Sequence, residues 1–331
     1  MKKIIMLLIT VIILVSCNSS NSSFIKENKS SINIFSINED LAINYIPDEK
    51  IKINELTDDK YSEAALIYSD GSVKKLNVNK GNIILNKKNI EDLKGIFLYN
   101  NFHSITSAYY ETKEFLDKNE RVLTVLLDGF SLGQYEYAKD NGYISFLSNY
   151  FAHEALSVYT PVTNAGYAAI ITGNTPDING IHDRSYREMK VDSIFQHALD
   201  NSKKTILLEG DIKILNTEVE PQLHIDLNKD EDTDDEMFYS TLQAADENYE
   251  LIFVHFHGID DRGHSYGPYS EETMDYIKKV DGFISELNEN WDGKIILTSD
   301  HGMHETEEGG NHGECRSSDM IVPYFTINST E

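Results

Sequence analysis

The sequence predicts an α/β fold with a mostly parallel central sheet flanked by helices, preceded by a small β-rich N-terminal module. Continuous apolar runs, typical of strands buried on both faces, occur at Val122–Leu127, Thr205–Leu208, Leu251–Val254 and Ile295–Leu297. Helical patterns lie between these runs, most clearly at Ser270–Leu287, where apolar residues recur on one face and two glutamates stand near the N-terminal end. Strands that alternate with helices in this way form a mostly parallel sheet.

The region before this pattern has shorter apolar runs, separated by turn signals such as Asp70-Gly71. We expect strands there at Ala42–Ile46, Ala64–Tyr68, Ile83–Leu85 and Gly95–Tyr99. We therefore assign residues 31–105 to a small β-rich module whose role the sequence does not indicate, and residues 106–331 to the α/β domain.

The 331-residue chain has the composition of a water-soluble globular protein, with 40% apolar and 25% charged residues. Its length suits two domains, or one large domain with an appendage. Asp and Glu total 55 against 29 Lys and Arg, which gives a formal net charge of −26. A chain this acidic repels a phosphate backbone over most of its surface, so we expect no nucleic-acid partner.

The acidic run Asp230–Glu236 is one local source of this charge. It lacks the glycine-centred spacing of the known calcium-binding loop, so we interpret it as a solvated approach to the following helix. A calcium loop is the less favoured alternative.

Residues 1–17 are expected to be a lipoprotein signal peptide. Two lysines precede an apolar run, Ile4–Val15, which is too short to cross about 30 Å of hydrocarbon. The run ends in a Leu-Val-Ser-Cys sequence that resembles the lipobox of bacterial lipoproteins, and residues 18–30 form a polar tether. We therefore expect Cys17 to carry lipid, and the protein to be exported and anchored to the outer face of a bacterial membrane. Cys315 would then be the only other thiol, so no intramolecular disulfide is expected.

Hard metal ligands follow the predicted strands of the α/β domain. Asp128 follows the first continuous run, Asp260 and His264 follow the third, and Asp300 and His301 follow the fourth, with His312 in the loop beyond. Because ligands bind outside the carboxyl ends of the strands in such sheets, we expect these side chains to converge at one edge. Histidine and aspartate without cysteine suit zinc, with manganese or magnesium as weaker fits.

Five ordered segments of the chain resemble the type I phosphodiesterase/nucleotide pyrophosphatase branch of the alkaline phosphatase superfamily: Asp128-Gly129, Thr163–Gly173, Asp177–Ile181, Asp260–Pro268 and Ser299–Met303. The resemblance covers about residues 120–330 and leaves out the β-rich module. It implies an alkaline phosphatase-like fold, two divalent metal ions, and cleavage of phosphodiester or nucleotide pyrophosphate bonds in a small phosphorylated substrate.

The resemblance also implies roles for individual residues. Thr163 aligns with the nucleophile that becomes phosphorylated, and it also stands at the expected N-cap of a helix over Ala165–Ile171. The ligands implied for one metal ion are Asp128, Thr163, Asp300 and His301, and those implied for the other are Asp260, His264 and His312. His304 is the alternative to His312, which we prefer because its Gly-Asn-His-Gly setting matches the family. His257, and to a lesser degree His255, could line the site and contact substrate.

Arg184 departs from the pattern of the family, which has at this position an asparagine that contacts a phosphate oxygen. Four of the five arginines lie within or beside the metal-ligand segments, namely Arg184, Arg187, Arg262 and Arg316. Since the guanidinium fork matches phosphate, we expect these side chains to form a local positive pocket for an anionic substrate. An arginine at position 184 would favour a phosphate monoester as the substrate.

The sequence therefore predicts an exported metal-dependent phosphohydrolase that cleaves phosphodiester or nucleotide pyrophosphate bonds through a phosphothreonine at a two-metal site. A phosphomonoesterase is the nearest alternative, because of Arg184. A phosphoethanolamine-type transferase is a second alternative, because His255–His264 also resembles such enzymes of the same superfamily. Those transferases cross the membrane many times, whereas no membrane span is expected in this chain after the signal peptide. A catalytically silent binding lipoprotein is the last alternative, and the intact ligand set argues against it.

Overall fold

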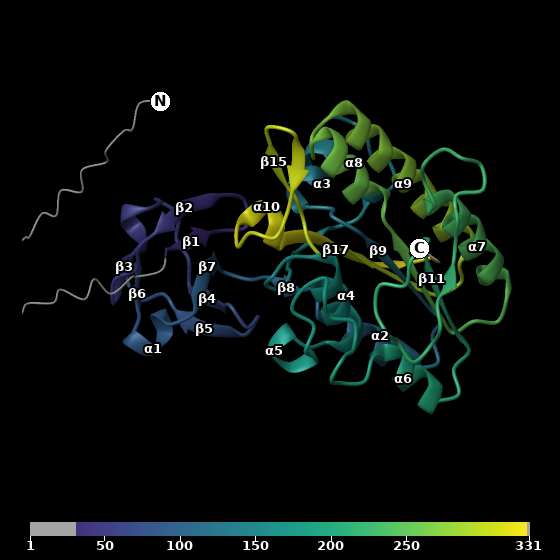
Figure 1. Ribbon diagram of the computed structural model, residues 1–331, viewed down its shortest axis with the longest axis horizontal. Coiled ribbons are helices and arrows are strands. Elements are labelled where there is room, and N and C mark those ends of the chain that lie inside the picture. Colours follow the sequence, from purple (N-terminus) through teal and green to yellow (C-terminus); the bar gives the residue numbers. More distant parts are fainter. Residues whose placement is uncertain (1–30, 330–331) are drawn as a thin grey trace, which may run out of the picture.

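Two sheets dominate the structure, a computed structural model that describes residues 31–329 (Figure 1). The expected signal peptide, Cys17 and the tether lie outside the described residues. The N-terminal part of the chain builds a five-stranded sheet, and the remainder builds an eight-stranded sheet. Within residues 31–329, none of the helices is both long and apolar enough to cross a membrane.

The eight-stranded sheet is mixed and mostly parallel. Its strands, in spatial order, are β12 (Gln222–Leu223), β11 (Thr205–Glu209), β13 (Leu251–Phe256), β9 (Val122–Leu127), β14 (Lys294–Thr298), β17 (Ile321–Asn328), β10 (His153–Leu156) and β8 (His103–Ser104). The first five run parallel to one another, β17 is antiparallel to both of its neighbours, and β8 is parallel to β10. The predicted α/β class with a mostly parallel sheet is confirmed.

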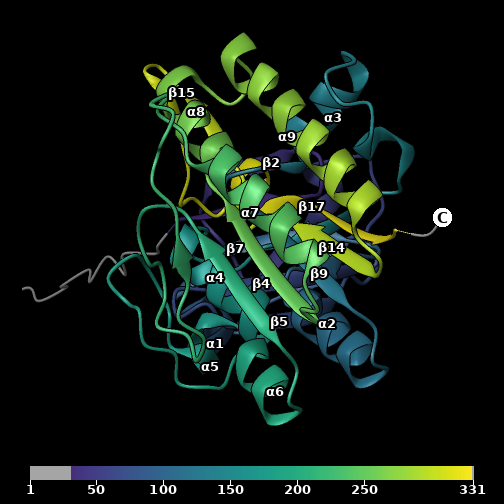
Figure 2. The same ribbon diagram turned by 90° about the vertical axis from the view of Figure 1, so that its right-hand side faces the viewer.

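Helices cover both faces of this sheet (Figure 1 and Figure 2). One face carries α3 (Leu132–Asp140), α7 (Asp234–Asp246) and α9 (Glu271–Asn290), and the other carries α2 (Ser107–Asp117), α4 (Thr163–Thr172) and α6 (Ile194–Asp200). Successive side chains of β9 alternate between two cores: Leu123 and Val125 join the first, and Val122 and Leu126 join the second. Burial on both faces is the reason that β9 is a continuous apolar run.

The helix α9 confirms the one expected over Ser270–Leu287. Ser270 is its N-cap, because the serine hydroxyl accepts a hydrogen bond from the backbone N–H of Thr273. The shorter elements of this part of the chain are α5 (Pro176–Asn179), α8 (Gly258–Tyr266), α10 (Ser317–Met320), a 3-10 turn at Leu147–Asn149 and the hairpin of β15 (His304–Thr306) and β16 (Gly309–Asn311).

The five-stranded sheet has the order β2 (Asp40–Tyr45), β1 (Ile32–Phe35), β7 (Leu93–Tyr99), β4 (Glu63–Tyr68) and β5 (Val73–Asn77). The pair β3 (Lys50–Lys52) and β6 (Asn82–Ile84), a 3-10 turn at Ile53–Glu55 and α1 (Lys87–Ile90) accompany it. One face of this sheet has a core of its own, whereas Phe35, Phe97 and Tyr99 join the core of the larger sheet. The four strands expected in this region are present, and the division of the chain at residue 105 stays a prediction.

Candidate active site

Three neighbouring parallel strands end at the candidate site. Asp128 follows β9, the middle strand of the three; Asp300 and His301 follow β14 on one side, and α8 carries Asp260 and His264 after β13 on the other. Parallel strands present their carboxyl ends at the same edge of a sheet. The structure therefore brings together side chains that are up to 173 residues apart, as between Asp128 and His301.

Two clusters of acidic and imidazole side chains that share His301 lie at this edge. In each cluster the possible ligand atoms lie within 4.8 Å of one another. One cluster consists of Asp128, Asp300 and His301, and the other consists of Asp260, His301 and His312. His264 adjoins the second cluster, with its Nε2 3.4 Å from Oδ2 of Asp260. Both clusters offer the nitrogen and oxygen donors that zinc prefers.

Backbone carbonyls orient His264, His301 and His312. Nδ1 of His264 lies 2.9 Å from the carbonyl oxygen of Gly310. Nδ1 of His301 lies 3.0 Å from that of Gly302, and Nδ1 of His312 lies 2.9 Å from that of Pro161. Since a carbonyl oxygen only accepts, Nδ1 of each ring carries a proton, and Nε2 is the ring nitrogen that is left to bind a metal ion. A histidine that binds metal through Nε2 is held in this way.

His304, the alternative to His312, lies apart from both clusters. Its Nδ1 is 2.8 Å from a carboxylate oxygen of the buried Asp319, and its Nε2 is 4.0 Å from Glu314. The structure thus places His312, and not His304, beside Asp260 and His301.

The separations between imidazoles and carboxylates in the clusters are longer than charge-assisted hydrogen bonds, which are about 2.7–2.9 Å. Nε2 of His301 is 3.3 Å from Oδ1 of Asp128 and 3.5 Å from Oδ2 of Asp300. Elsewhere in the chain, His197 and His304 approach aspartates to 2.9 and 2.8 Å. A tetrahedral cation bound to each donor at about 2.0–2.1 Å holds the donors about 3.3 Å apart, so the spacing fits a metal site.

Two carboxylate oxygens of the clusters, Oδ2 of Asp300 and Oδ1 of Asp260, are buried without a hydrogen-bond partner among residues 31–329. Burial raises the pKa of Asp300 well above its usual range, and the neighbouring carboxylate of Asp128 adds to this effect. Burial lowers the pKa of His301, but the carboxylates of Asp300 and Asp128 outweigh burial and raise it to about 10. Buried carboxylate oxygens without hydrogen-bond partners destabilise the folded state unless a cation balances their charge.

Thr163 lies beside the first cluster. Its Oγ1 is 3.5 Å from Oδ1 of Asp128 and 3.4 Å from Nε2 of His301, and its side chain is buried. Val162 is the N-cap of α4, and Thr163 is the first residue of the helix. The expectation that Thr163 is the N-cap is therefore wrong, and its hydroxyl faces the candidate ligands instead.

Two glycines permit the close approach of the elements that meet here. A Cβ on Gly166 of α4 would lie 2.3 Å from the carbonyl oxygen of Asp300. A Cβ on Gly129, whose φ is +70°, would lie 2.7 Å from Oδ1 of Asp260. A larger residue at either position would push α4 away from Asp300 or the turn after β9 away from α8.

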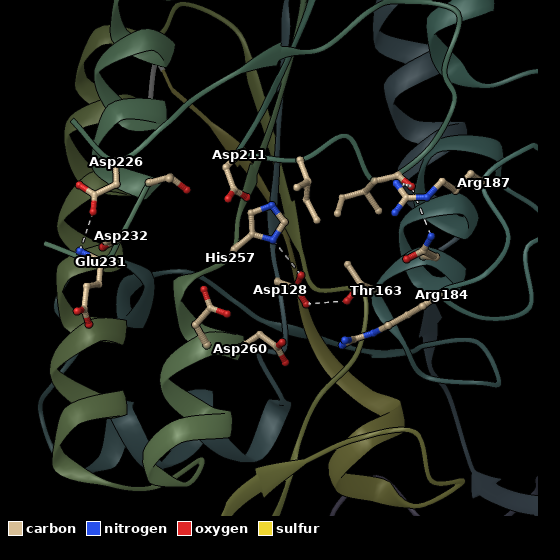
Figure 3. A pocket seen from close by; sticks show the side chains of 16 residues that line it. Asp128, Thr163, Arg184, Arg187, Asp211, Asp226, Glu231, Asp232, His257 and Asp260 are labelled. Carbon is tan, nitrogen blue, oxygen red and sulfur yellow. Dashed lines mark hydrogen bonds and ion pairs between the residues drawn. The ribbon is translucent and has the colours of Figure 1, made fainter. Parts of the chain in front are cut away.

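The clusters open into a pocket of about 450 Å³ (Figure 3). One end is lined by Asp128, Thr163, Asp260, Arg184 and Arg187, and the lining away from Thr163 is acidic, with Asp211, Asp226, Glu231 and Asp232. His257 lies between Asp128 and Asp211. Nη2 of Arg184 is 3.1 Å from Nε2 of His312, so this arginine reaches the clusters.

A family model described as "Type I phosphodiesterase / nucleotide pyrophosphatase" matches residues 195–315. Residues 195–315 are therefore similar to the type I phosphodiesterase/nucleotide pyrophosphatase family. The resemblance inferred from the sequence is confirmed, and the family is one of enzymes that act on phosphoester bonds. The matched residues include Asp260, His264, Asp300, His301 and His312, and they begin after Asp128 and Thr163.

Curated relatives match a shorter stretch of the chain. The chain is 37% identical over 95 residues to GPI ethanolamine phosphate transferase 1 of Mus musculus, a match that covers 26% of this chain and 10% of that protein. The Homo sapiens protein of the same name is 35% identical over 95 residues, with the same coverage. The matched stretch thus spans about a tenth of the length of these relatives.

Two solved structures are similar to part of the chain. Phosphonoacetate hydrolase of Sinorhizobium meliloti 1021, in complex with phosphonoformate, has a TM-score of 0.45 at 20% identity, with 56% of this chain and 57% of that chain covered. Murine ectonucleotide pyrophosphatase / phosphodiesterase 5, in an inactive form with AMP, has a TM-score of 0.44 at 17% identity, with 57% and 59% covered.

Of the four arginines close to the family's segments, Arg184 and Arg187 line the pocket. Arg262 instead lies over the ring of Tyr276, 5.4 Å from its centroid, and Arg316 pairs with Asp40 of β2 at 3.0 Å. The expected positive pocket of four arginines is therefore wrong, because two of the guanidinium groups have partners elsewhere. Arg316 instead ties the segment after β16 to the five-stranded sheet.

The acidic run Asp230–Glu236 is not wholly solvated, contrary to the expectation from its charge pattern and spacing. Asp232 and Asp234 are buried, and α7 begins at Asp234. Asp232 accepts hydrogen bonds from Tyr276 and Lys279, which lie 44 and 47 residues further along the chain. A local signal could not have revealed these contacts, because both partners belong to α9.

Proposed function

We propose that this protein is a metal-dependent phosphohydrolase that cleaves phosphodiester or nucleotide pyrophosphate bonds through a phosphothreonine at Thr163. The position of the Thr163 hydroxyl carries the proposal, since it lies 3.5 Å from Asp128 and 3.4 Å from His301 at one end of the pocket. A threonine hydroxyl is a weak nucleophile at neutral pH and needs a neighbouring base or cation. The family match supports the same class of bond.

The donors at the site fit two divalent cations, and zinc suits the mixture of imidazole and carboxylate best. One ion would be held by Asp128, Thr163, Asp300 and His301, and the other by Asp260, His264 and His312. When bound, the ions would supply the positive charge that lowers the pKa of the threonine hydroxyl and neutralises the leaving oxygen.

The residues of the chain would then support a displacement at phosphorus in two steps. The Thr163 hydroxyl gives up its proton to solvent and Oγ1 forms a bond to phosphorus while the bond from phosphorus to the leaving oxygen breaks; the leaving group departs with that oxygen and takes up a proton from solvent. Water then attacks the phosphothreonine, so that the bond between Oγ1 and phosphorus breaks and Thr163 is regenerated. Because α4 starts at Thr163, the N–H groups of its first turn would face a phosphate bound at Thr163. Arg184 adds a charge-assisted hydrogen bond to a phosphate oxygen.

Esters of phosphoethanolamine are a second candidate class of substrate. The curated relatives are named ethanolamine phosphate transferases. The acidic part of the pocket, with Asp211, Asp226 and Glu231, would attract the ammonium group of such a substrate while its phosphate lies near Thr163. Hydrolysis would result if water accepts the phosphoryl group, and transfer would result if an alcohol accepts it.

The test is a substrate screen with zinc-loaded protein. It uses a nitrophenyl phosphate monoester, a bis-nitrophenyl diester, a dinucleotide polyphosphate and glycerophosphoethanolamine. We expect the fastest turnover with the diester or the pyrophosphate bond. Preference for glycerophosphoethanolamine would favour the second candidate, and preference for the monoester would favour a phosphomonoesterase. Metal-loaded protein that cleaves none of them would contradict the enzymatic proposal and favour a binding lipoprotein.

We also propose that the protein is exported and anchored through lipid on Cys17, on the basis of the lipobox-like sequence. Wild-type protein expressed in a bacterium should sediment with membranes and be released by detergent. Cys17→Ser should move the protein to the soluble fraction. Equal sedimentation of the two proteins would contradict the lipid anchor.

A further inference from the structure

The carboxylate of Asp128 faces two separate groups of donors. Oδ1 faces Thr163 and His301, as described above. Oδ2 faces a second pair of imidazoles and lies 3.2 Å from Nε2 of His255 and 3.3 Å from Nδ1 of His257. The two-metal site proposed above makes no use of this pair.

The chain presents both histidines to the same oxygen. His255 belongs to β13, and His257 is the first residue after β13 and the N-cap of α8; a nitrogen of each ring faces Oδ2 of Asp128. Their ring centroids are 3.9 Å apart, and their ligand atoms and that of Asp128 lie within 4.8 Å of one another. His255 is fully buried, whereas His257 lines the pocket. The triad is therefore a buried site with one side open.

The separations between imidazole and carboxylate in this triad, 3.2 and 3.3 Å, are longer than those of two other His–Asp pairs in the described part of the chain. His197 and His304 lie 2.9 and 2.8 Å from their aspartates. The two Asp128 separations are longer, and they match the distance of about 3.3 Å between two donors bound to one tetrahedral cation at about 2.0–2.1 Å. The spacing thus fits a coordination site, and the three residues form a group that could hold a metal ion.

We propose that Asp128, His255 and His257 bind a third divalent cation, of the zinc class. Two imidazole nitrogens and one carboxylate suit zinc better than magnesium or calcium, which prefer oxygen donors. Asp128 bridges this ion and the ion beside Thr163, with one oxygen for each. The fourth coordination position opens to the pocket beside His257, where water or a substrate oxygen completes the tetrahedron. The proposal shares Asp128 with the proposed function but does not depend on the reaction.

The test counts zinc ions per chain. Wild-type protein and variants are stripped of metal, dialysed against a fixed micromolar concentration of free Zn²⁺, and analysed by mass spectrometry. We expect His257→Leu to hold one zinc ion fewer than the wild type. His153→Leu is the matched control, because it removes an imidazole that also lies close to another, 4.1 Å from His103 between ring centroids, at the far side of the sheet. It should leave the zinc content unchanged.

Anomalous diffraction at the zinc edge provides a second readout that does not require a variant. A peak within bonding distance of Oδ2 of Asp128 and both imidazoles is expected in crystals of the wild type. Its absence, or equal zinc contents in the wild type and a folded His257→Leu, would overturn the proposal. The two histidines would then be hydrogen-bond donors that orient Asp128. Circular dichroism tests whether His257→Leu is folded. If the variant does not fold, the anomalous difference map of the wild type alone tests the third zinc site.

His312→Ala separates this proposal from the proposed function. If His312→Ala loses no zinc while His257→Leu loses one ion, the two-metal site is wrong and the third site stands. If His312→Ala loses one ion while His257→Leu loses none, the third site is wrong and the two-metal site stands.

Discussion

Asp234 holds the start of α8: its Oδ2 accepts a hydrogen bond from the backbone N–H of Gly258 at 3.0 Å. Its Oδ1 accepts the backbone N–H of His257 at 2.9 Å, and Oδ2 also accepts the hydroxyl of Tyr276 at 2.8 Å. A carboxylate at a helix N-terminus satisfies N–H groups that lack partners within the helix and interacts favourably with the helix dipole. Because Asp260 and His264 stand one turn apart on α8, Asp234 positions both candidate ligands.

We predict that Asp234→Asn weakens zinc binding to Asp260, His264 and His312. An amide must present its NH₂ group where a carboxylate oxygen accepts a backbone N–H, so at least one buried hydrogen bond is lost, at a cost of about 1–3 kcal/mol. The zinc affinity, measured by competition with a chelator, should fall by about tenfold or more.

Asp281 provides a matched control for this change. It is a buried aspartate that accepts the backbone N–H groups of Ser145, Phe146 and Leu147, outside the pocket. Asp281→Asn should lower the midpoint of thermal unfolding but leave the zinc affinity unchanged. Equal losses of zinc affinity in the two variants would show that Asp234 acts only through general stability.

We predict that Thr163→Ala abolishes turnover while the metal content and the fold are retained. Loss of a covalent nucleophile should lower kcat by orders of magnitude. The contacts of the hydroxyl with Asp128 and His301 are long, 3.5 and 3.4 Å, so thermal stability should change little. Thr163→Ser keeps a hydroxyl and serves as the control. Retention of a tenth of wild-type activity in metal-loaded Thr163→Ala would exclude this nucleophile.

We predict that His312→Ala lowers the zinc content by one ion per chain and slows turnover severely, whereas His304→Ala keeps every ion. Nδ1 of His312 is held by the carbonyl of Pro161, which turns Nε2 towards Asp260. His304 pairs with Asp319 instead, so its removal should cost stability, about 1–2 kcal/mol, without loss of metal. Zinc analysis and thermal unfolding measure both effects, and loss of zinc from His304→Ala alone would reverse the assignment.

We predict that Arg184→Asn lowers kcat/KM for phosphate monoesters by roughly 10–150-fold and changes diester turnover much less. A monoester carries more negative charge than a diester, and a charge-assisted hydrogen bond made in the transition state is worth about 1.5–3 kcal/mol. Steady-state kinetics on both substrates test this prediction. Equal losses would make Arg184 a general phosphate-binding residue, and no loss on either would place it outside the reaction.

We predict that the metal-free protein loses stability as the pH rises from 6.5 towards 10. Asp300 and Asp128 outweigh burial and raise the pKa of His301 to about 10 in the folded chain, against 6.5 for an ordinary histidine. A base with a raised folded pKa stabilises the folded state fully below pH 6.5 and loses this contribution as the pH rises to the folded pKa. Zinc replaces the proton, so the zinc-loaded protein should lack this loss. The midpoint of thermal unfolding, measured against pH with and without a chelator, tests this difference. An equal fall of the midpoint with pH under both conditions would contradict the prediction.

The sequence by itself determined the main strands, the helix α9 and the positions of the candidate ligands. Val122–Leu127 is a continuous apolar run because β9 is buried on both faces, and such patterns are local properties of the chain. Asp128, Asp260 and Asp300 could be selected because each stands after such a run, and parallel strands bring their carboxyl ends to one edge whatever the details of packing.

Only the tertiary structure decided which atoms face one another at that edge. Asp234 is indistinguishable in the sequence from the acidic residues around it, and its burial follows from α8 and α9, which fold over it. The sequence likewise does not show that Arg316 pairs with Asp40, which lies 276 residues away. Nor does it show that Oδ1 of Asp128 faces Thr163 while Oδ2 faces His255. The physical reason is that periodicity depends on neighbours in the chain, whereas burial, hydrogen bonding and coordination depend on side chains that only the packing of distant elements brings together.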